Sequence, residues 1–212
     1  MIDSHQLALF VPVIVVMVLL PGPDVLFVLA QSARGGARDG ILAMLGITSA
    51  FFFVHVAGAA LGISALIVKS VFLFSVLKYA GAAYLIYLGV KTLLKRKESG
   101  DFASSETSRR TSTRPFAQGF ITNVLNPKVA IFMLAFLPQF VMLNHGSVAV
   151  QILELGAIWG VAGAIALSLV AFAGGSFALL RSRSERIQRL ERYITGAIFV
   201  SLGLRVAIPD RR

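Results

Sequence analysis

The chain has 212 residues, of which 57% are hydrophobic and only 14% are charged. A soluble domain is about one-quarter charged, so this composition excludes most soluble, disordered and fibrous classes. The formal net charge of +10 would suggest nucleic-acid binding in a soluble protein. The chain has no cysteine, which excludes a disulfide, a thiolate metal site and a thiol redox couple. The excess of apolar residues indicates a protein whose solvent is a lipid bilayer.

Hydrophobic stretches long enough to cross a bilayer occur six times along the chain. A transmembrane helix needs about 20 mostly apolar residues. The six candidate spans are residues 6–30, 40–68, 71–94, 116–142, 148–180 and 193–208. The sixth is the weakest because Arg205 lies near its end, so a version with five spans stays open. The first is not a cleaved signal peptide, since it lacks a basic start and its apolar stretch is too long.

The positive charges gather on one side of these spans. Fourteen of the 20 Lys and Arg residues lie in the connections after the first, third and fifth spans. Because Lys and Arg are enriched in cytoplasmic loops, these connections are predicted to be cytoplasmic and both termini to be periplasmic or extracellular. Topology thus explains the charge, and nucleic acid is not an expected partner. The expected location is the cytoplasmic (inner) membrane, crossed several times.

Similar motifs recur in the two halves of the chain. Residues 78–91 of the third span match residues 192–205 of the sixth at four of 14 positions, with a basic residue at both ends of each copy. Residues 22–25 (Gly-Pro-Asp-Val) in the first span correspond to residues 126–129 (Asn-Pro-Lys-Val) in the fourth. Because each half holds three spans, the second half would enter from the opposite side. This is an inverted-topology repeat, a recurring design of secondary transporters.

The fold expected from these patterns is an all-α membrane protein. Six transmembrane helices form two inverted three-helix repeats, and helices 1 and 4 are broken. The parts are residues 1–96 as the first repeat, residues 97–114 as a Ser- and Thr-rich flexible cytoplasmic linker, and residues 115–212 as the second repeat. All belong to one integral membrane domain.

Proline interrupts the first and fourth spans at equivalent positions. The helix-breaking residues are Pro21, Gly22 and Pro23 in the first span and Pro127 in the fourth. Proline has no N–H, so the carbonyl groups of Met17, Leu19 and Asn123 lose their helical donors. Free carbonyls at membrane depth are tolerated only against protein or a water-filled cavity. The half-helices that restart after the breaks direct N–H groups and a positive dipole end into them.

A charged side chain follows each break, Asp24 in the first span and Lys128 in the fourth. An ionised group at this depth costs at least about 2.5–3.5 kcal/mol, so two at equivalent positions indicate a central polar site. There Asp24 would carry an exchangeable proton or bind a substrate ammonium, and Lys128 would meet a carboxylate. Asn123 and Asn126 would add neutral hydrogen bonds, which suits a zwitterion. The alternative is an internal Asp24–Lys128 ion pair that only joins two helices.

His55 lies deep in the second span. It serves there either as a proton relay or as a structural histidine with satisfied hydrogen bonds. The spacing of Thr48, His55 and Gly62 by seven residues predicts that they share a helix face. The chain has no GxSxG, Walker or HExxH motif and no convincing metal-ligand spacing. Neither an enzyme, a metal site nor a cofactor is therefore expected.

Other residues of the spans indicate helix packing. Gly58 and Gly62 in the second span and Gly156 and Gly160 in the fifth are small residues four apart, the spacing at which helices approach closely, within or between subunits. Trp159 could face lipid or a pore, but packing is the favoured role.

Taken together, several of these motifs resemble the LysE/RhtB family of amino-acid exporters, and its homoserine/threonine-exporter-like members in particular. The motifs are residues 21–29, residues 78–89, Asn123 with residues 126–128, and residues 137–140. His55 also falls where many of those members carry a histidine. The resemblance implies a six-helix inner-membrane exporter of amino acids or similar metabolites, coupled to protons and in some cases dimeric. Many relatives have another residue at the Asp24 position, so the resemblance does not assign a proton role to Asp24.

The leading hypothesis is a secondary active exporter of amino acids or related small zwitterions, working by proton antiport and alternating access. Its partners would be the substrate, protons and the lipid bilayer, with a homodimer as a further option. One alternative is a cation or metal transporter of the same superfamily, in which Asp24 and freed carbonyls bind the ion, although Lys128 beside them opposes a cation. The other alternative is a non-transporting membrane interaction protein.

Overall fold

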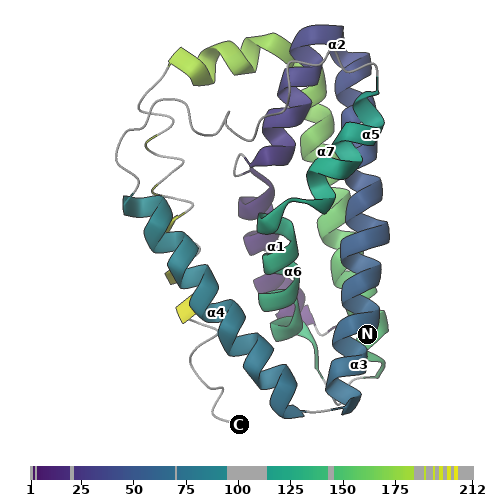
Figure 1. Cartoon of the computed structure of the whole chain (residues 1–212), viewed down its shortest axis with the longest axis vertical. Coiled ribbons are helices and arrows are strands. Elements are labelled where there is room, and N and C mark those ends of the chain that lie inside the picture. Colours follow the sequence, from purple (N-terminus) through teal and green to yellow (C-terminus); the bar gives the residue numbers. More distant parts are fainter. Residues whose placement is uncertain are drawn as a thin grey trace.

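The computed structural model describes residue 2, residues 4–19, 22–69, 71–94, 114–142 and 146–183, and scattered positions between 189 and 204. Every regular element in these ranges is a helix. Successive long segments run in alternate directions along the longest axis of the molecule (Figure 1). Within the described ranges, two helical stretches are long and apolar enough to cross a membrane, and a bent helix pair would make a third.

The first predicted break is present between α1 (Ser4–Leu19) and α2 (Pro23–Ala50). α2 itself has two arms, because Gly35 has non-helical angles and Gly36 has a φ of 72°. Glycine adopts this left-handed conformation without a steric penalty, so the chain reverses within two residues. The predicted span ends at residues 30 and 40 therefore fall inside helix. The apolar stretch ends there, but the backbone hydrogen bonding continues into the charged residues.

The second predicted span continues from α2 through a π-helix, η1 (Phe51–Val56), into α3 (Ala57–Lys69). A π-helix holds more residues per turn than an α-helix, so a seven-residue spacing across it no longer marks one face. His55 is buried, whereas Gly62 is exposed with open space around it. The predicted common face is therefore wrong for Gly62.

The remaining predicted spans agree closely with the helices. α4 covers Val71–Leu94, and α7 covers Val148–Arg183. The fourth span consists of α5 (Pro115–Val124) and α6 (Pro127–Ala135), followed by a 3-10 helix, η3 (Leu137–Phe140). The helices before and after Pro127 are bent by 46°, so the second predicted break is also present. Residues 97–113 of the predicted linker lie outside the described part, as does most of the predicted sixth span.

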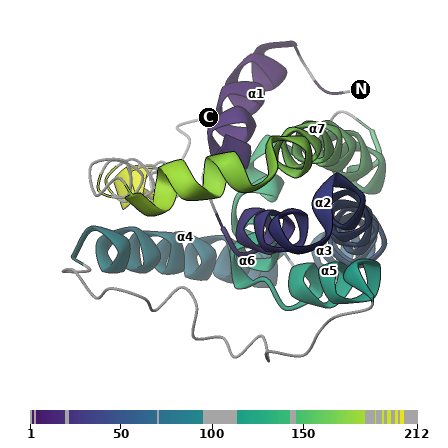
Figure 2. The same cartoon turned by 90° about the horizontal axis from the view of Figure 1, so that it is seen from above.

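Glycine allows the central helices to approach closely. α2 packs against both α5 and α7, and these helices lie side by side in two views (Figures 1 and 2). A Cβ on Gly46 would collide with the carbonyl oxygen of Phe116, and one on Gly119 would collide with that of Ala43. Only glycine permits such close contact between the backbones of α2 and α5.

The two predicted pairs of small residues behave differently. Gly156 and Gly160 of α7 face Val56 and Phe52 of η1 so closely that a Cβ on either would collide with them. The predicted packing is therefore confirmed for this pair. Gly58 and Gly62 are exposed, and no atom of the described residues lies within 4 Å of a Cβ built on them. They have no packing partner in the described part of this chain.

Aromatic rings fill the centre, and apolar side chains cover the outside. Phe132 and Trp159 have ring centroids 4.9 Å apart, and Phe51 lies 5.0 Å from the same indole. On the outer surface, large apolar side chains are strongly exposed, including Phe53 at 78% and Leu61 at 75%. An apolar exterior of this kind fits a membrane and not water.

Candidate substrate site

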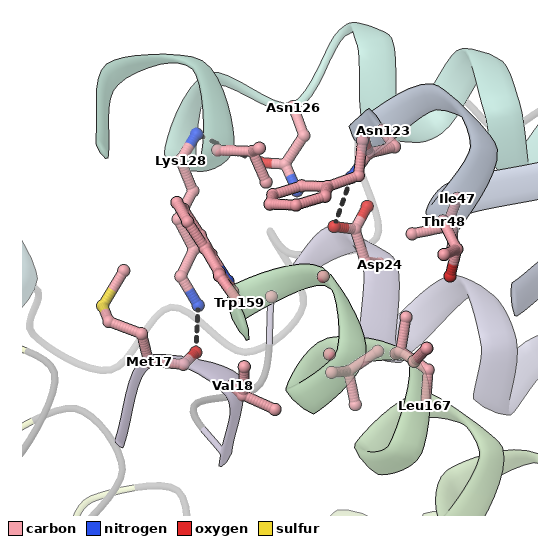
Figure 3. A pocket seen from close by; sticks show the side chains of 17 residues that line it. Met17, Val18, Asp24, Ile47, Thr48, Asn123, Asn126, Lys128, Trp159 and Leu167 are labelled. Carbon is pink, nitrogen blue, oxygen red and sulfur yellow. Dashed lines mark hydrogen bonds between the residues drawn. The ribbon is translucent and has the colours of Figure 1, made fainter. Parts of the chain in front are cut away.

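The two broken helices meet inside the molecule, where side chains of one break contact the backbone and side chains of the other (Figure 3). At the first break, α1 ends at Leu19 and Gly22 is the N-cap of α2. At the second, α5 ends at Val124 and Asn126 is the N-cap of α6. Pro23 and Pro127 are the first residues of α2 and α6, where a proline without an N–H is tolerated. Pro21 lies outside the described residues.

Lys128 reaches from the second break to the first. Its Nζ donates a hydrogen bond to the Met17 carbonyl oxygen at 3.2 Å. This carbonyl is one of those predicted to lose a helical donor, because residue 21 is a proline. The lysine side chain passes beside Gly22, where an added Cβ would lie 3.5 Å from Cδ and 3.6 Å from Nζ. The ammonium group therefore satisfies the carbonyl that the first break leaves open.

Asp24, at the first break, is bound by side chains of the second break. The Asn123 side chain donates from Nδ2 to Oδ2 of Asp24 at 3.0 Å, and the Asn126 side chain also interacts with this carboxylate. Oδ1 of Asp24 and Oδ1 of Asn123 are buried, and neither has a hydrogen-bond partner of good geometry among the described residues. Buried acceptors of this kind are uncommon and indicate a place where a ligand or water donates.

The second break is closed largely by its own residues. Asn126 caps α6, because its Oδ1 accepts a hydrogen bond from the Lys128 backbone N–H at 3.0 Å. The Asn123 carbonyl, freed by Pro127, accepts from the Asn126 N–H at 2.9 Å and lies 2.9 Å from His55 Nε2. Because a carbonyl oxygen can only accept, the second contact is a hydrogen bond when Nε2 carries a proton. His55 thus touches the break through the backbone.

The break residues surround one cavity of about 80 Å³. One water needs about 10–15 Å³ of such space, so the cavity has room for several waters or a small polar head group. The break contributes its polar lining: Gly22, Asp24, Asn123, Asn126 and Lys128. The remaining wall comes mainly from α1, α2, η1 and α7 and includes Met17, Val18, Ile47, Thr48, Phe51, Trp159, Gly160, Gly163, Ala164 and Leu167 (Figure 3).

The predicted site residues fall into two groups in space. Asp24, Asn123, Asn126 and Lys128 line the same cavity, whereas His55 does not and reaches it only through Asn123. Apart from Trp159, for which a pore-lining role stayed open, the part of the lining from α7 was not predicted. Trp159 packs as expected but also lines the cavity. No signal in the sequence indicated the other lining residues of α7, because an apolar helix is hydrophobic on every face.

The site places groups of opposite charge around one cavity. The carboxylate of Asp24 and the ammonium of Lys128 attract each other, and the N-termini of α2 and α6 add positive dipole ends. Such an arrangement can bind an ammonium and a carboxylate of one molecule at the same time. The described residues include no group of three or more His, Cys, Asp or Glu side chains that could hold a metal ion.

Comparison with known proteins gives a consistent result. Residues 15–209 match the model of the LysE type translocator family. The uncharacterized membrane protein YrhP of Bacillus subtilis is 33% identical over 211 residues, covering 96% of this chain and 99% of YrhP. An uncharacterized membrane protein of Pseudomonas aeruginosa is 32% identical over 197 residues (92% and 91%). The leucine efflux protein of Salmonella typhimurium is 29% identical over 194 residues (90% and 89%). No solved structure matches.

Proposed function

Since the chain belongs to the LysE type translocator family and is a multi-pass membrane transporter rather than an enzyme, we propose that it exports amino acids or related small zwitterions across the cytoplasmic membrane. The family resemblance predicted from the motifs is thereby confirmed. The observation that carries the proposal is the cavity that Asp24 and Lys128 line together. The similarity to leucine efflux proteins supports an amino acid as the substrate class.

In the proposed binding step, the substrate ammonium binds Asp24 at Oδ1, the oxygen without a partner of good geometry in the described structure. The substrate carboxylate binds the Lys128 ammonium, which then leaves the Met17 carbonyl. A zwitterion adds one positive and one negative charge, so the cavity stays neutral overall. Neutrality matters because an unbalanced charge in a low-dielectric site is expensive.

In the proposed proton antiport, Asp24 binds either a proton or a substrate ammonium, but not both. The carboxylate takes a proton from the outside after the substrate leaves, and it releases that proton to the cytoplasm before the next substrate binds. The proposal requires that the site changes sides only when a proton or a substrate is bound. With the zwitterion bound the site is neutral overall, and with the proton bound Asp24 is neutral and the site keeps the single positive charge of Lys128. Because occupancy by a proton and by the substrate exclude each other, their movements are coupled in opposite directions.

The proposed inverted repeat and alternating access are supported by contacts that occur in equivalent pairs. A Cβ on Gly89 would meet the Gly196 backbone, and one on Gly203 would meet that of Ala82. The repeat equates Ala82 with Gly196 and Gly89 with Gly203, so the two contacts exchange places. The breaks behave similarly, because the charged residue after each break contacts the half-helix before the other. Rocking of one half against the other would expose the cavity to each side in turn.

The proposed orientation places the basic end of the molecule in the cytoplasm. The turn in α2, the start of α5 and the end of α7 lie at the same end (Figure 1). Arg34, Arg38 and Arg114 are exposed there. A reporter fused after Arg212 tests this orientation together with the sixth span. With six spans, the reporter lies on the periplasmic or extracellular side. A reporter in the cytoplasm would contradict the six-span topology.

The transport proposal is tested with the purified full-length chain in proteoliposomes. Vesicles are loaded with each of the twenty labelled amino acids, and a pH gradient is imposed across the membrane. We expect gradient-dependent flux of at least one amino acid, absent from protein-free vesicles and abolished when the gradient is collapsed. Absence of gradient-dependent flux for all twenty would contradict the proposal. A thermal-shift screen of the same amino acids in detergent gives an independent measure of binding.

A further inference from the structure

Two glycines of α7 line the cavity for different reasons. At Gly160 the Phe52 ring packs against the helix backbone, and a Cβ at this position would collide with the ring. At Gly163 no atom of the described residues lies within 4 Å of a Cβ built on the backbone. Glycine weakens a helix relative to alanine, and the packing of described neighbours does not require it at position 163. The absent side chain instead leaves space in the cavity wall.

The surroundings of this space are apolar. Gly163 lines the cavity together with Ala164 and Leu167 of α7 and Ile47 of α2. The nearby Thr48 directs its hydroxyl to the sulfur of Met44 in its own helix. The polar groups of the cavity lie instead on the break residues, as Figure 3 shows for Asp24, Asn123 and Asn126. A ligand held by those groups would therefore place its apolar part against α7.

From this placement we propose that Gly163 determines the size of the transported side chain. The inference rests on the proposed export of zwitterions and adds that the substrates are aliphatic amino acids, whose side chain enters the open space beside Gly163. The ammonium and carboxylate of the substrate lie at Asp24 and Lys128, and its side chain occupies the space beside Gly163. A larger residue at position 163 would fill this space and leave room only for small substrates.

The experiment compares leucine with alanine flux in proteoliposomes containing the full-length chain. The variants are Gly163→Ala and Gly163→Leu. The matched controls are Gly58→Ala and Gly58→Leu, because Gly58 also has open space around it but lies on an exposed helix face. We expect Gly163→Leu to lower the leucine-to-alanine flux ratio by about tenfold or more, since changes of apolar volume in a binding pocket have effects of this size. Gly163→Ala shifts the ratio less, in the same direction.

The outcomes separate this inference from the transport proposal. If the wild-type chain moves neither amino acid nor any other, the transport proposal and the inference fail together. If it does transport but both Gly163 variants keep the wild-type ratio, or the Gly58 variants shift it equally, only the inference is overturned. Should Gly163→Leu fail to fold, Gly163→Ala still decides, because its Cβ enters open space. A thermal-shift assay provides a second readout. In the Gly163→Leu variant, added leucine should no longer raise the melting temperature, whereas added alanine still should.

Discussion

The two helix breaks share a sequence pattern but solve their hydrogen bonding differently. The second break satisfies itself, because Asn126 caps the restarted helix and donates its N–H to the Asn123 carbonyl. The first break has Gly22 as N-cap, without a side chain to cap the helix, and depends on Lys128 of the other half for the Met17 carbonyl. The second break is thus a fixed frame, in the sense that its own residues make its hydrogen bonds. The first break is bound to it by the hydrogen bonds of Lys128 with Met17 and of Asn123 with Asp24, which a substrate can replace.

The largest effect is expected from Lys128→Ala, because it removes both the proposed carboxylate ligand and the donor to Met17. A hydrogen bond to a charged group is worth about 1.5–3 kcal/mol, so loss of the proposed contact with the substrate carboxylate should lower flux in proteoliposomes by roughly 10- to 100-fold. Membrane protein levels should remain normal. Lys91→Ala is the control, since Lys91 is exposed and lies over the Tyr87 ring. Wild-type flux in Lys128→Ala would favour the alternative that the Asp24–Lys128 pair only joins two helices.

Asp24→Asn should come next, because it preserves the shape of the side chain but removes its charge. Flux driven by a pH gradient should be lost, since asparagine cannot exchange the proton that the proposed antiport requires. The new amide oxygen can still accept from Asn123, but Lys128 loses its opposite charge, so the melting temperature in detergent should fall as well. The two measurements are gradient-driven flux and the melting temperature. Gradient-driven flux at the wild-type level would show that Asp24 is not the proton carrier.

His55→Ala should have a smaller effect, because the Asn123 carbonyl keeps its bond from the Asn126 N–H. The loss of one hydrogen bond corresponds to about 0.5–1.5 kcal/mol of stability. His55→Gln distinguishes the two roles predicted for this residue, since its amide donates a hydrogen bond but does not titrate near neutral pH. Rescue of both melting temperature and flux by glutamine indicates a structural histidine. Rescue of the melting temperature alone indicates a proton relay.

The smallest effects compare the caps of the two breaks. Asn126→Ala removes a side-chain cap and should cost about 1 kcal/mol, which lowers the melting temperature by roughly 2–4 °C. Gly22→Ala adds a Cβ at ordinary contact distance from Lys128, so the melting temperature should stay near that of the wild type. Thermal unfolding followed by fluorescence measures both. A larger loss for Gly22→Ala than for Asn126→Ala would reverse the assignment of the second break as the fixed frame.

Much of the fold and part of the site followed from the sequence. The apolar stretch at residues 71–94 predicted the bounds of α4, and the prolines predicted both breaks. The pairing of charge with proline predicted that Asp24 and Lys128 lie near one site. The partner of Lys128 did not follow, because a long flexible side chain can reach several of the carbonyls that the prolines free. Its contact with Met17 depends on how the two halves pack.

Other features could not be predicted for a physical reason specific to membrane helices. A helix surrounded by lipid and apolar neighbours is hydrophobic on every face, so its pattern does not mark which side lines a cavity. The wall formed by Gly163 and Leu167 was missed for this reason. The π-helix at Phe51–Val56 was missed similarly, because uniform hydrophobicity gives no period that could reveal the widened turn.

The hydrogen bond between Lys128 and Met17 also has a consequence for how the protein is made. The two residues are 111 positions apart, and translation proceeds at roughly 5–20 residues per second. The Met17 carbonyl therefore exists for on the order of ten seconds before its partner is synthesised. During that interval the newly inserted first half must keep this carbonyl near water or lipid headgroups. The first break can settle at its final depth only after the second has emerged from the ribosome.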